Sequence, residues 1–392
     1  MFETRPLSFT SPERVRLRAL ASRIQAVLEK HRKNTLKIDD GPHRYAYVTG
    51  DATRSIVARG IIGIPTRGCS YARSSWMGCA VCGHNASSLW KAGISDSEVL
   101  DEFEKSITAL GAKQPSELCL YTSGSFLDST ELPEAVRSQI ISRVAKLGWV
   151  KSIVVESMPQ FVQYDALKGI NGALQGKQLT ISMGLDSSND LVRSVCFQRH
   201  ITGERYRTAV AICRDLSIRS VAYLVHGVPF LAIQESIYDT ANSIRDALES
   251  FGFDSVSVEP VAMQAGTIQE LAKLINPNCL SPNFWSLTAS LDAFAALSSM
   301  APSEWAEKIV IGGQFFTPLP VDTVKACIRC LDSVTQKEGL SVAKVLLTLP
   351  LLDSCGKCCE VNRLTARKFS NSDLPKMVDS QLSCFELTAL SP

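Results

Sequence analysis

The chain of 392 residues lacks several features that would assign it to a common class. No apolar run approaches the length of a membrane span, and Met1–Arg5 lack the apolar segment of a signal peptide. No Gly-x-Gly-x-x-Gly or Gly-x-x-x-x-Gly-Lys-Ser/Thr loop follows a candidate strand, so the common nucleotide-binding folds are not supported. We therefore expect a cytoplasmic protein that has no membrane contact.

Histidine is scarce, with 5 residues, whereas cysteine is abundant, with 13. Without an export signal, the cysteines are interpreted as reduced thiols and metal ligands rather than disulfides. The histidines show no pairing pattern that would identify a catalytic base. His226, at the end of a candidate strand, is the one histidine that we consider for the active site.

Three cysteines lie in one short loop after the apolar stretch 61–65. Cys69, Cys79 and Cys82 form a C-x9-C-x2-C pattern. A [4Fe–4S] cluster usually has four cysteine ligands. Three thiolates would therefore hold such a cluster and leave one iron open to an outside ligand. A zinc knuckle with His84 as the fourth ligand and a set of free buried thiols are the alternatives.

A second cysteine group lies near the C-terminus. Cys327 and Cys330 form one C-x2-C knuckle, and Cys355 and Cys358 form another, with 24 residues between them. Paired knuckles place four sulfurs tetrahedrally, which suits structural zinc, but an auxiliary iron–sulfur cluster takes the same ligands. Metal-free thiols are the third interpretation.

Short β-rich runs alternate with helical stretches, which predicts an α/β protein with parallel strands. The candidate strands are 61–65, 117–122, 152–156, 179–184, 220–226 and 255–261. Six such units fit a partial (β/α)6 barrel of TIM type, although the spacing equally fits an open doubly wound sheet. The cysteine loop favours the barrel over the open sheet. We expect the barrel to carry an N-terminal helical extension and a C-terminal cysteine-rich segment. We expect domain limits at 1–57, 58–300 and 301–392.

The N-terminal extension carries a basic amphipathic helix. Residues 11–33 contain seven Lys or Arg against two Glu, and apolar residues recur there at helical spacing. Ser11-Pro12 is a suitable start for this helix. Its basic face is either a solvated surface over the barrel or a contact for nucleic-acid phosphates.

Polar motifs follow three of the strands, where barrels place their chemistry. The turn 123–126 exposes backbone groups, and its glycine permits close approach of another molecule. Glu156 ends the third strand and could contact a cofactor or a substrate ammonium. The segment 182–190 offers polar groups suited to a ribose or carboxylate, or caps a helix through Ser187 or Ser188. The candidate binding residues are Ser123, Gly124, Ser125, Phe126, Glu156, Ser182, Gly184 and Asp186.

Together these motifs resemble the radical S-adenosylmethionine (SAM) subunit of archaeosine synthase, a family related to the elongator-complex catalytic subunit. The most specific parts are the cysteine loop and Thr122-Ser-Gly-Ser-Phe-Leu-Asp128, and the likeness runs from about residue 60 to the C-terminal cysteines. The resemblance implies a radical SAM barrel in which a [4Fe–4S] cluster and SAM generate a 5′-deoxyadenosyl radical. It also implies that the turn after the second strand binds the amino group of SAM.

In that family a lyase-type C–N cleavage removes a lysine side chain from a 7-deazaguanine in tRNA and leaves a formamidine. The resemblance therefore implies tRNA modification with a partner subunit and a one-electron reductant of flavodoxin or ferredoxin type. Glu156 and His226 are the candidate catalytic residues because each lies at the end of a candidate strand. His226-Gly-Val replaces the Lys-Pro-type sequence expected at that strand, which keeps open a small-molecule or natural-product substrate. A non-enzymatic zinc-stabilised RNA-binding protein is the third hypothesis.

Overall fold

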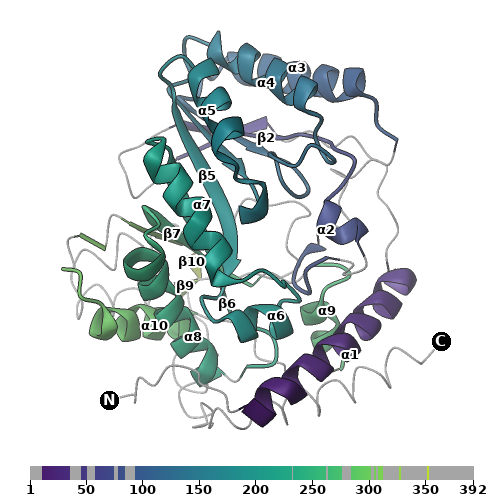
Figure 1. The fold of residues 1–392 in the computed structure, drawn as a ribbon, viewed down its shortest axis with the longest axis vertical. Helices are drawn as coiled ribbons and strands as arrows, with labels where there is room; N and C mark the ends of the chain where they lie inside the picture. The colour runs from purple at the N-terminus through teal and green to yellow at the C-terminus, as the bar shows by residue number, and fades with distance from the viewer. Residues whose placement is uncertain are drawn as a thin grey trace.

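Strands of the computed structural model lie in one main sheet in the same order as in the sequence (Figure 1). The structure describes residues 11–35, 46–50, 58–74, 78–83, 93–231, 233–261, 264–275, 284–301, 304–305, 308–311, 326–327 and 351–352. The strands of this sheet are β1 (Ala46–Gly50), β2 (Ala58–Gly63), β3 (Glu117–Tyr121), β4 (Ser152–Glu156), β5 (Gln178–Asp186), β6 (Arg219–His226), β7 (Ser255–Pro260) and β8 (Ile309–Ile311).

The sheet is parallel from β2 to β8, and only β1 pairs in the antiparallel sense, with β2. The strand order never reverses, whereas a doubly wound sheet has a reversal at its switch point. Among the described strands, β8 does not pair back onto the start of the sheet. The predicted partial barrel is therefore confirmed, with all six predicted strands present and β8 added as a further parallel strand.

Helices connect the strands and cover the outer face of the sheet (Figure 1). Their bounds are α2 (Ser70–Arg73), α3 (Asp96–Gly111), α4 (Glu134–Ala145), α5 (Tyr164–Ala173), α6 (Asp190–Cys196), α7 (Gly203–Asp215), α8 (Ile233–Arg245), α9 (Ile268–Ile275) and α10 (Phe284–Leu297), with short turns η2 (Pro159–Phe161) and η3 (Asp246–Phe251). Local sequence sets their ends, as at α3, where Ser95 and Glu98 form a reciprocal capping box.

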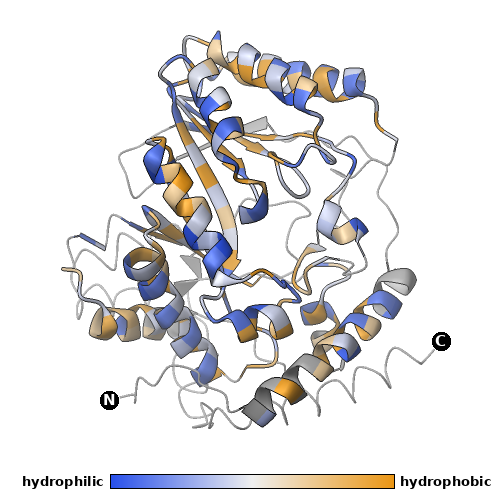
Figure 2. Cartoon of the chain, viewed as in Figure 1, coloured by the Kyte–Doolittle hydropathy of each residue, from blue (hydrophilic) through white to orange (hydrophobic). Residues whose placement is uncertain are grey.

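Strand alternation separates an apolar outer face from an inner face that is mixed. Leu118 and Leu120 of β3 point outward into the main apolar core beneath the helices. Cys119 lies between them in sequence and faces inward, where it packs with Ile61 and Val154. Figure 2 shows the corresponding bands of apolar and hydrophilic residues along β5. The period of two in each strand therefore decides which side chains reach the barrel interior.

The interior is closed at the amino-terminal ends of the strands. There the Arg59 guanidinium on β2 pairs with the Glu117 carboxylate on β3, with Nη2 2.6 Å from Oε1. Ser152 of β4 donates its hydroxyl to the other oxygen of Glu117, at 3.0 Å. These side chains fill the amino-terminal end of the barrel interior. A cavity is therefore expected at the opposite end, where the strands end.

The N-terminal helix α1 (Ser11–Thr35) forms as predicted and lies against α6 (Figure 1). Leu20, Ile24, Val27 and Leu28 are buried in a second apolar cluster that also contains residues of α6 and α9. Val15, which the sequence placed on the apolar face, is 69% exposed. The apolar stripe therefore packs the middle of the helix, residues 20–28, against the rest of the chain.

The sheet runs beyond both predicted limits of the barrel segment, because β1 precedes residue 58 and β8 follows residue 300. The domain limits themselves stay a prediction. Near the C-terminus, β9 (Ala326–Cys327) and β10 (Leu351–Leu352) form a separate short parallel pair. In the part of the chain that the structure describes, no helix is both long enough and apolar enough to span a membrane.

Candidate active site

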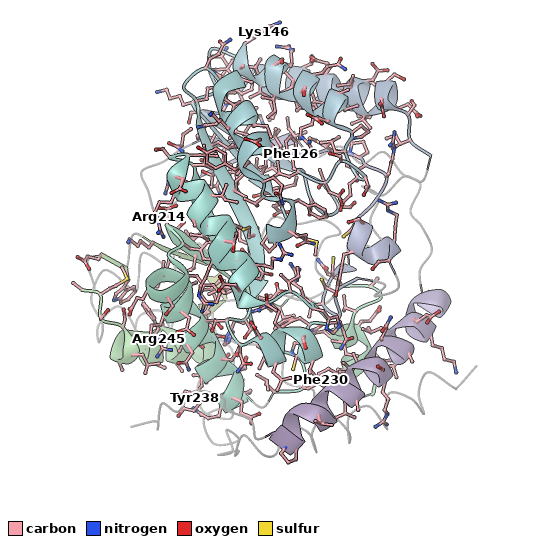
Figure 3. All side chains as sticks on the ribbon, viewed as in Figure 1. Phe126, Lys146, Arg214, Phe230, Tyr238 and Arg245 are labelled. Carbon is pink, nitrogen blue, oxygen red and sulfur yellow. The ribbon has the colours of Figure 1, made fainter. Side chains whose placement is uncertain are left out.

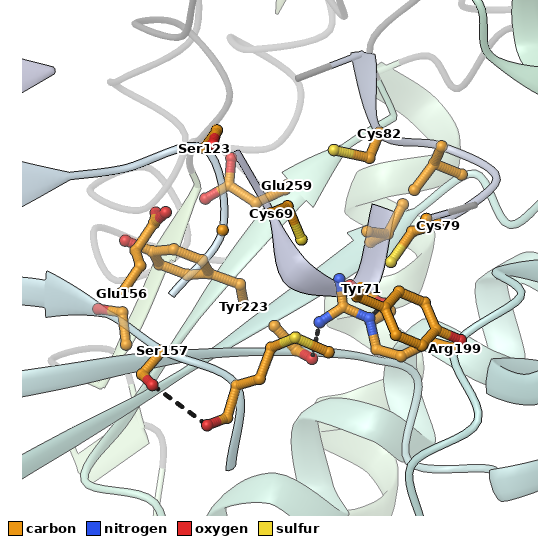
Figure 4. A pocket seen from close by; sticks show the side chains of 18 of the residues that line it. Cys69, Tyr71, Cys79, Cys82, Ser123, Glu156, Ser157, Arg199, Tyr223 and Glu259 are labelled. Carbon is orange, nitrogen blue, oxygen red and sulfur yellow. Dashed lines mark hydrogen bonds and ion pairs between the residues drawn. The ribbon is translucent and has the colours of Figure 1, made fainter. Parts of the chain in front are cut away.

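A cavity of about 250 Å³ lies at the carboxyl ends of the parallel strands (Figure 4). Its wall combines the cysteine loop with the ends of β4, β5, β6 and β7 and the turn that follows β3. Because strands of a parallel barrel all point the same way, these distant segments meet at one end. Most of the residues that the sequence singled out are therefore brought together here.

Cys69, Cys79 and Cys82 all line this cavity. Burial raises the pKa of the Cys69 thiol well above its usual range, and the negative charges of Glu131, Cys79 and Cys82 raise it further. The three sulfurs are thus close enough to interact electrostatically. Because burial disfavours an uncompensated thiolate, ionised sulfurs in this loop need a cationic partner such as a metal centre.

Backbone hydrogen bonds fix the second part of the cysteine loop between two helices. The Ala80 N–H donates to the Phe197 carbonyl after α6, at 2.9 Å, and the Ile268 N–H of α9 donates to the Ala80 carbonyl, at 3.0 Å. The Gly83 N–H donates to Gln264 Oε1 at 2.7 Å, and a side chain on Gly83 would collide with Gln264. Cys79 and Cys82 are therefore held by the barrel body.

The three loop thiols line one cavity, where a [4Fe–4S] cluster could take them as ligands. In the described residues, no group of three or more His, Cys, Asp or Glu side chains is arranged to hold one metal ion. A [4Fe–4S] cluster instead distributes its thiolate ligands over different iron atoms. Three thiols spread around one cavity suit that requirement. His84, the fourth ligand in the zinc alternative, lies outside the described residues.

The turn after β3 is joined to the cysteine loop by Glu131. Its Oε1 accepts a hydrogen bond from the Ser70 N–H at 2.9 Å, and its Oε2 accepts one from the Ser125 N–H at 2.8 Å. Burial raises the pKa of Glu131 to about 7, although both N–H groups lower it. A Cβ on Gly124 would lie 2.3 Å from Glu131 Oε2. The glycine is therefore required by this carboxylate, a constraint that the sequence did not reveal.

The predicted binding turn divides into a part on the wall and a part behind it. Ser123 and Gly124 line the cavity, whereas Ser125 and Phe126 do not. Ser125 accepts a hydrogen bond from the Met158 N–H, and the Phe126 N–H donates to the Glu156 carbonyl. Phe126 itself is fully buried in the main core (Figure 3). The last two residues thus attach the turn to the end of β4.

The segment after β5 brings Ser182, Gly184 and Asp186 to the cavity wall. A register irregularity lies between Gly184 and Asp186, and Asp186 has a φ of 60°. Ser182, Gly184 and Asp186 are each two residues apart, so strand alternation puts all three on the inner face. The sequence also allowed Ser187 or Ser188 to cap the following helix, but neither caps α6. Asn189 is the cap, because its side chain accepts hydrogen bonds from the Leu191 and Val192 N–H groups.

Among the described residues that line the cavity, Arg199 is the cationic side chain, and it is already paired. Its Nε lies 2.7 Å from Asp186 Oδ2, and its Nη1 donates to the Gly184 carbonyl at 2.8 Å. Burial raises the pKa of Asp186, and the Arg199 and Arg193 charges lower it. The pair fixes the floor of the cavity beside Tyr71 and the cysteines (Figure 4).

Glu156 lines the cavity at the end of β4, with Ser157 and Met158 following it. Burial is the main cause that raises its pKa to about 8, the Glu259 charge adds to this, and a hydrogen bond from the Tyr223 hydroxyl opposes it. The Tyr223 hydroxyl also lies 3.2 Å from that of Tyr121. This carboxyl group is therefore near its point of ionisation at neutral pH.

His226 lies on the other side of β6 from the cavity. It is buried, with Nδ1 3.0 Å from Thr240 Oγ1 and Nε2 2.8 Å from Ser286 Oγ. Burial lowers its pKa to about 3. Along β6 the odd-numbered residues 221, 223 and 225 are partly exposed and the even-numbered residues are buried. His226 is even-numbered, so its side chain lies on the helix-covered face of the sheet. The structure therefore removes the geometric basis for a catalytic role, which the sequence had predicted.

The C-terminal cysteine group is mostly outside the described residues. Cys327 ends β9, whereas Cys330, Cys355 and Cys358 are not among the residues that the structure describes. Apart from Cys327 and the three cysteines in the loop, the described cysteines are Cys119, Cys196 and Cys213, and these three are buried.

The cavity residues that sequence reasoning did not assign to the site include Tyr71, Arg199, Tyr223 and Glu259. Two of them had a readable signal. In β7, Ser255, Ser257 and Glu259 alternate with valines, which is the pattern of a strand with one polar face. In β6 the same alternation puts Tyr223 inward. Arg199 and Tyr71 lie in loops whose path no local pattern predicts.

No protein-family model matches the chain. It is 28% identical over 227 residues to an uncharacterised protein of Methanocaldococcus jannaschii, a match that covers 57% of this chain and 60% of that protein. It is 27% identical over 208 residues to archaeosine synthase subunit beta of Thermococcus kodakarensis, covering 53% of this chain and 63% of that subunit. The predicted resemblance to archaeosine synthase is therefore confirmed, and the matches span about 60% of the length of these relatives.

Among solved structures, the crystal structure of methylornithine synthase aligns with 98% of this chain and 97% of its own. The sequence identity is 11% and the TM-score is 0.43, a likeness too weak to support an argument about the reaction.

Proposed function

We propose that the chain is a radical SAM enzyme that binds a [4Fe–4S] cluster through Cys69, Cys79 and Cys82. The observation that carries the proposal is the meeting of three thiols with the polar strand ends of a parallel barrel around one cavity. The resemblance to archaeosine synthase subunit beta supports it. When bound, the cluster and SAM supply a radical able to remove hydrogen from an unactivated C–H bond.

In this proposal the residues of the chain position SAM and substrate and keep water out. Ser123, Gly124 and Ser182 offer backbone and hydroxyl groups to SAM, and Gly184 and Asp186 continue that surface. Ser125 and Phe126 support the turn from behind. The apolar part of the cavity wall includes Val81, Met158, Val225 and Val261. Hydrophobic lining of this kind limits solvent near a reactive intermediate.

For the reaction, we propose an archaeosine-synthase-like, lyase-type C–N cleavage that forms a formamidine on a 7-deazaguanine in tRNA. The relatives named archaeosine synthase subunit beta support this choice, and the word subunit in their name supports a partner chain. A cytoplasmic one-electron reductant of flavodoxin or ferredoxin type completes the proposal. Glu156 is the candidate catalytic residue that stays on the cavity wall.

Anaerobic reconstitution with iron and sulfide tests the cofactor proposal. The wild-type protein should bind about four iron atoms in this loop and release 5′-deoxyadenosine from SAM after reduction. Replacement of Cys69, Cys79 and Cys82 by Ala should abolish both properties. Cys213→Ala is the matched control, because Cys213 is a buried cysteine in the core beneath the helices. Unchanged SAM cleavage in the triple variant would exclude a radical SAM function.

RNA binding tests the substrate class. Contacts with phosphates release counterions, so their affinity falls steeply with salt, whereas a small substrate in a cavity shows little salt dependence. If the helix α1 contacts tRNA, replacing Arg14, Arg16, Arg18 and Arg23 by Gln should weaken binding and flatten the salt slope. SAM cleavage without substrate should not change. Absence of tRNA binding at about 50 mM salt, with and without candidate partner subunits, would favour the small-molecule alternative.

For the C-terminal knuckles we propose a second metal site, with structural zinc as the first choice and an auxiliary iron–sulfur cluster as the second. Cys355→Ser should lower zinc content and thermal stability together, because a closed zinc site contributes to folding. A zinc-free protein with about eight iron atoms per chain would establish the auxiliary cluster instead.

A further inference from the structure

Two carboxylates from opposite parts of the barrel face the cavity without a cation of their own. Glu156 ends β4 and Glu259 belongs to β7, and both line the cavity. Their charges interact, because the Glu259 carboxylate contributes to the raised pKa of Glu156. Among the described cavity residues the cationic side chain is Arg199, and Asp186 already pairs with it. The Arg199 charge lowers the pKa of Glu156, but its ion pair is with Asp186, so the two glutamates form an acidic pair with no ion-pair partner of its own among the described residues.

Hydrogen bonds leave one oxygen of the pair available. Glu259 Oε1 accepts a 2.6 Å hydrogen bond from the Ser257 hydroxyl, which orients the carboxylate. Oε2 of the same group is buried and has no hydrogen-bond partner. A buried carboxylate oxygen without a donor is costly, and native structures normally supply one. The donor that this oxygen lacks is therefore expected from a bound molecule.

The ionisation state of the pair points to the same conclusion. Burial raises the pKa of Glu259 to about 7, and burial together with the Glu259 charge raises that of Glu156 to about 8. Near neutral pH the pair thus retains protons when the cavity holds no cation. A ligand with positive charge and N–H donors would displace these protons and satisfy the oxygen. A neutral ligand could donate a hydrogen bond to this oxygen, but it would not displace the protons.

We propose that Glu156 and Glu259 bind a positively charged nitrogen group of the substrate, an ammonium or an amidinium. Tyr223 belongs to β6, which lies between β4 and β7 in the sheet. Its hydroxyl hydrogen-bonds to Glu156 and so helps to orient that carboxylate (Figure 4). The inference rests on the proposed function only in placing the substrate in the same cavity as SAM. It defines the substrate as a cationic amine or amidine, whether its remainder is tRNA or a small molecule.

The test measures binding of small cations rather than turnover. The probes are n-butylamine and acetamidine, with n-butanol as the neutral isostere of the amine, added to reconstituted protein with SAM bound. We expect each cation to bind at least about tenfold more tightly than n-butanol, which is roughly 1.4 kcal/mol. Calorimetry at pH 7.5 in two buffers of different ionisation enthalpy should also detect proton release as each cation binds.

Glu259→Gln should reduce the preference for the cation to within about threefold and abolish most of the proton release. Asp239→Asn is the matched control, because burial raises the pKa of Asp239 to about 7 on α8, away from the cavity wall. That control should keep the preference and the proton release. If Glu259→Gln does not fold, Glu156→Gln tests the same pair.

Three outcomes would overturn the proposal. They are equal binding of the cation and n-butanol by wild-type protein, an unchanged preference in folded Glu259→Gln, or a loss of SAM affinity in that variant with probe binding intact. The last result would assign the pair to SAM, which is itself a cation. Failure of the proposed function is distinguishable, because it appears as absent iron or absent SAM cleavage in wild-type protein.

Discussion

At the amino-terminal ends of β2–β4 the barrel interior closes around an ion pair, whereas at the carboxyl ends it opens into a cavity lined by carboxylates. Arg59 and Glu117 neutralise each other at the closed end, and Ser152 completes the hydrogen bonding of Glu117. At the open end the charges of Glu156 and Glu259 interact, and one oxygen of Glu259 has no donor. The same inner face therefore carries satisfied charge at one end and unsatisfied charge at the other.

The Arg59–Glu117 pair at the closed end stabilises the fold, whereas Glu156 and Glu259 at the open end are suited to bind a ligand. A matched pair contributes modest stability and needs nothing further. Carboxylates held together in a buried cavity reduce the stability of the ligand-free protein at neutral pH, because their raised pKa values oppose ionisation. Such a cost is common at binding sites, where evolution selects for the complex. Substitutions at the two ends should therefore have different consequences.

The largest effect at the open end is expected for Glu131, which joins the cysteine loop to the turn after β3. Glu131→Ala leaves the partly buried Ser70 N–H and the buried Ser125 N–H without their acceptor. Each lost hydrogen bond to a charged group costs about 1.5–3 kcal/mol, so we expect a total loss of about 3 kcal/mol or more. Thermal unfolding measures the stability, and iron content after reconstitution measures the position of Cys69.

Gly124 supplies an internal control for that interpretation. Gly124→Ala alone should be damaging because its Cβ would lie 2.3 Å from Glu131 Oε2, whereas nothing lies within 4 Å of a Cβ at Gly148. Gly148→Ala should therefore be tolerated. Adding Gly124→Ala to Glu131→Ala should cost less than adding it to wild type. Additive effects would mean that Glu131 does not impose the glycine.

The second prediction concerns the pH dependence that Glu259 creates. Its pKa rises from 4.5 to about 7 in the folded chain, so its contribution to stability is complete below pH 4.5 and is lost as the pH rises through 7. Glu259→Gln should remove that decline and make the iron-free protein about 2 kcal/mol more stable at pH 8 than wild type. Urea unfolding at pH 5 and pH 8 measures the change. A parallel decline in both proteins would place the titration elsewhere.

Features that depend on local sequence could be predicted for this chain, whereas contacts between distant segments could not. Strand positions and the cysteine loop were predictable because alternation, strand-forming residues and ligand spacing are local properties. Glu259 had a readable period-two signal, and His226 was misplaced because its position at a strand end was considered without its parity. The Glu131 bridge joins residues 61 positions apart, so no local pattern contains it.

His226 gives the third prediction, on the outer face of the sheet. Burial lowers its pKa from 6.5 to about 3, so its contribution to stability is present above pH 6.5 and is lost as the pH falls toward 3. His226→Gln should cost about 1–2 kcal/mol at pH 7, because Thr240 and Ser286 lose well-placed partners. The acid-side loss of stability should become shallower, and SAM cleavage should stay within about twofold of wild type. A large loss of SAM cleavage in the folded variant would restore a catalytic role for His226.

The smallest effect is expected at the closed end, for Glu117→Gln. Removing one charge breaks the ion pair with Arg59, but both side chains retain some solvent contact, at 28% and 16% exposure, so water compensates part of the loss. Partly exposed pairs contribute at most about 1 kcal/mol, and the amide oxygen of Gln can still accept from Ser152. Thermal unfolding should therefore show a small decrease that shrinks further in high salt. Iron content, SAM affinity and the cation preference should equal those of wild type, because the pair lies at the end of the strands opposite the cavity. A change in the cation preference would show that the two ends are electrostatically coupled, and would require Glu117 to be counted with the acidic pair.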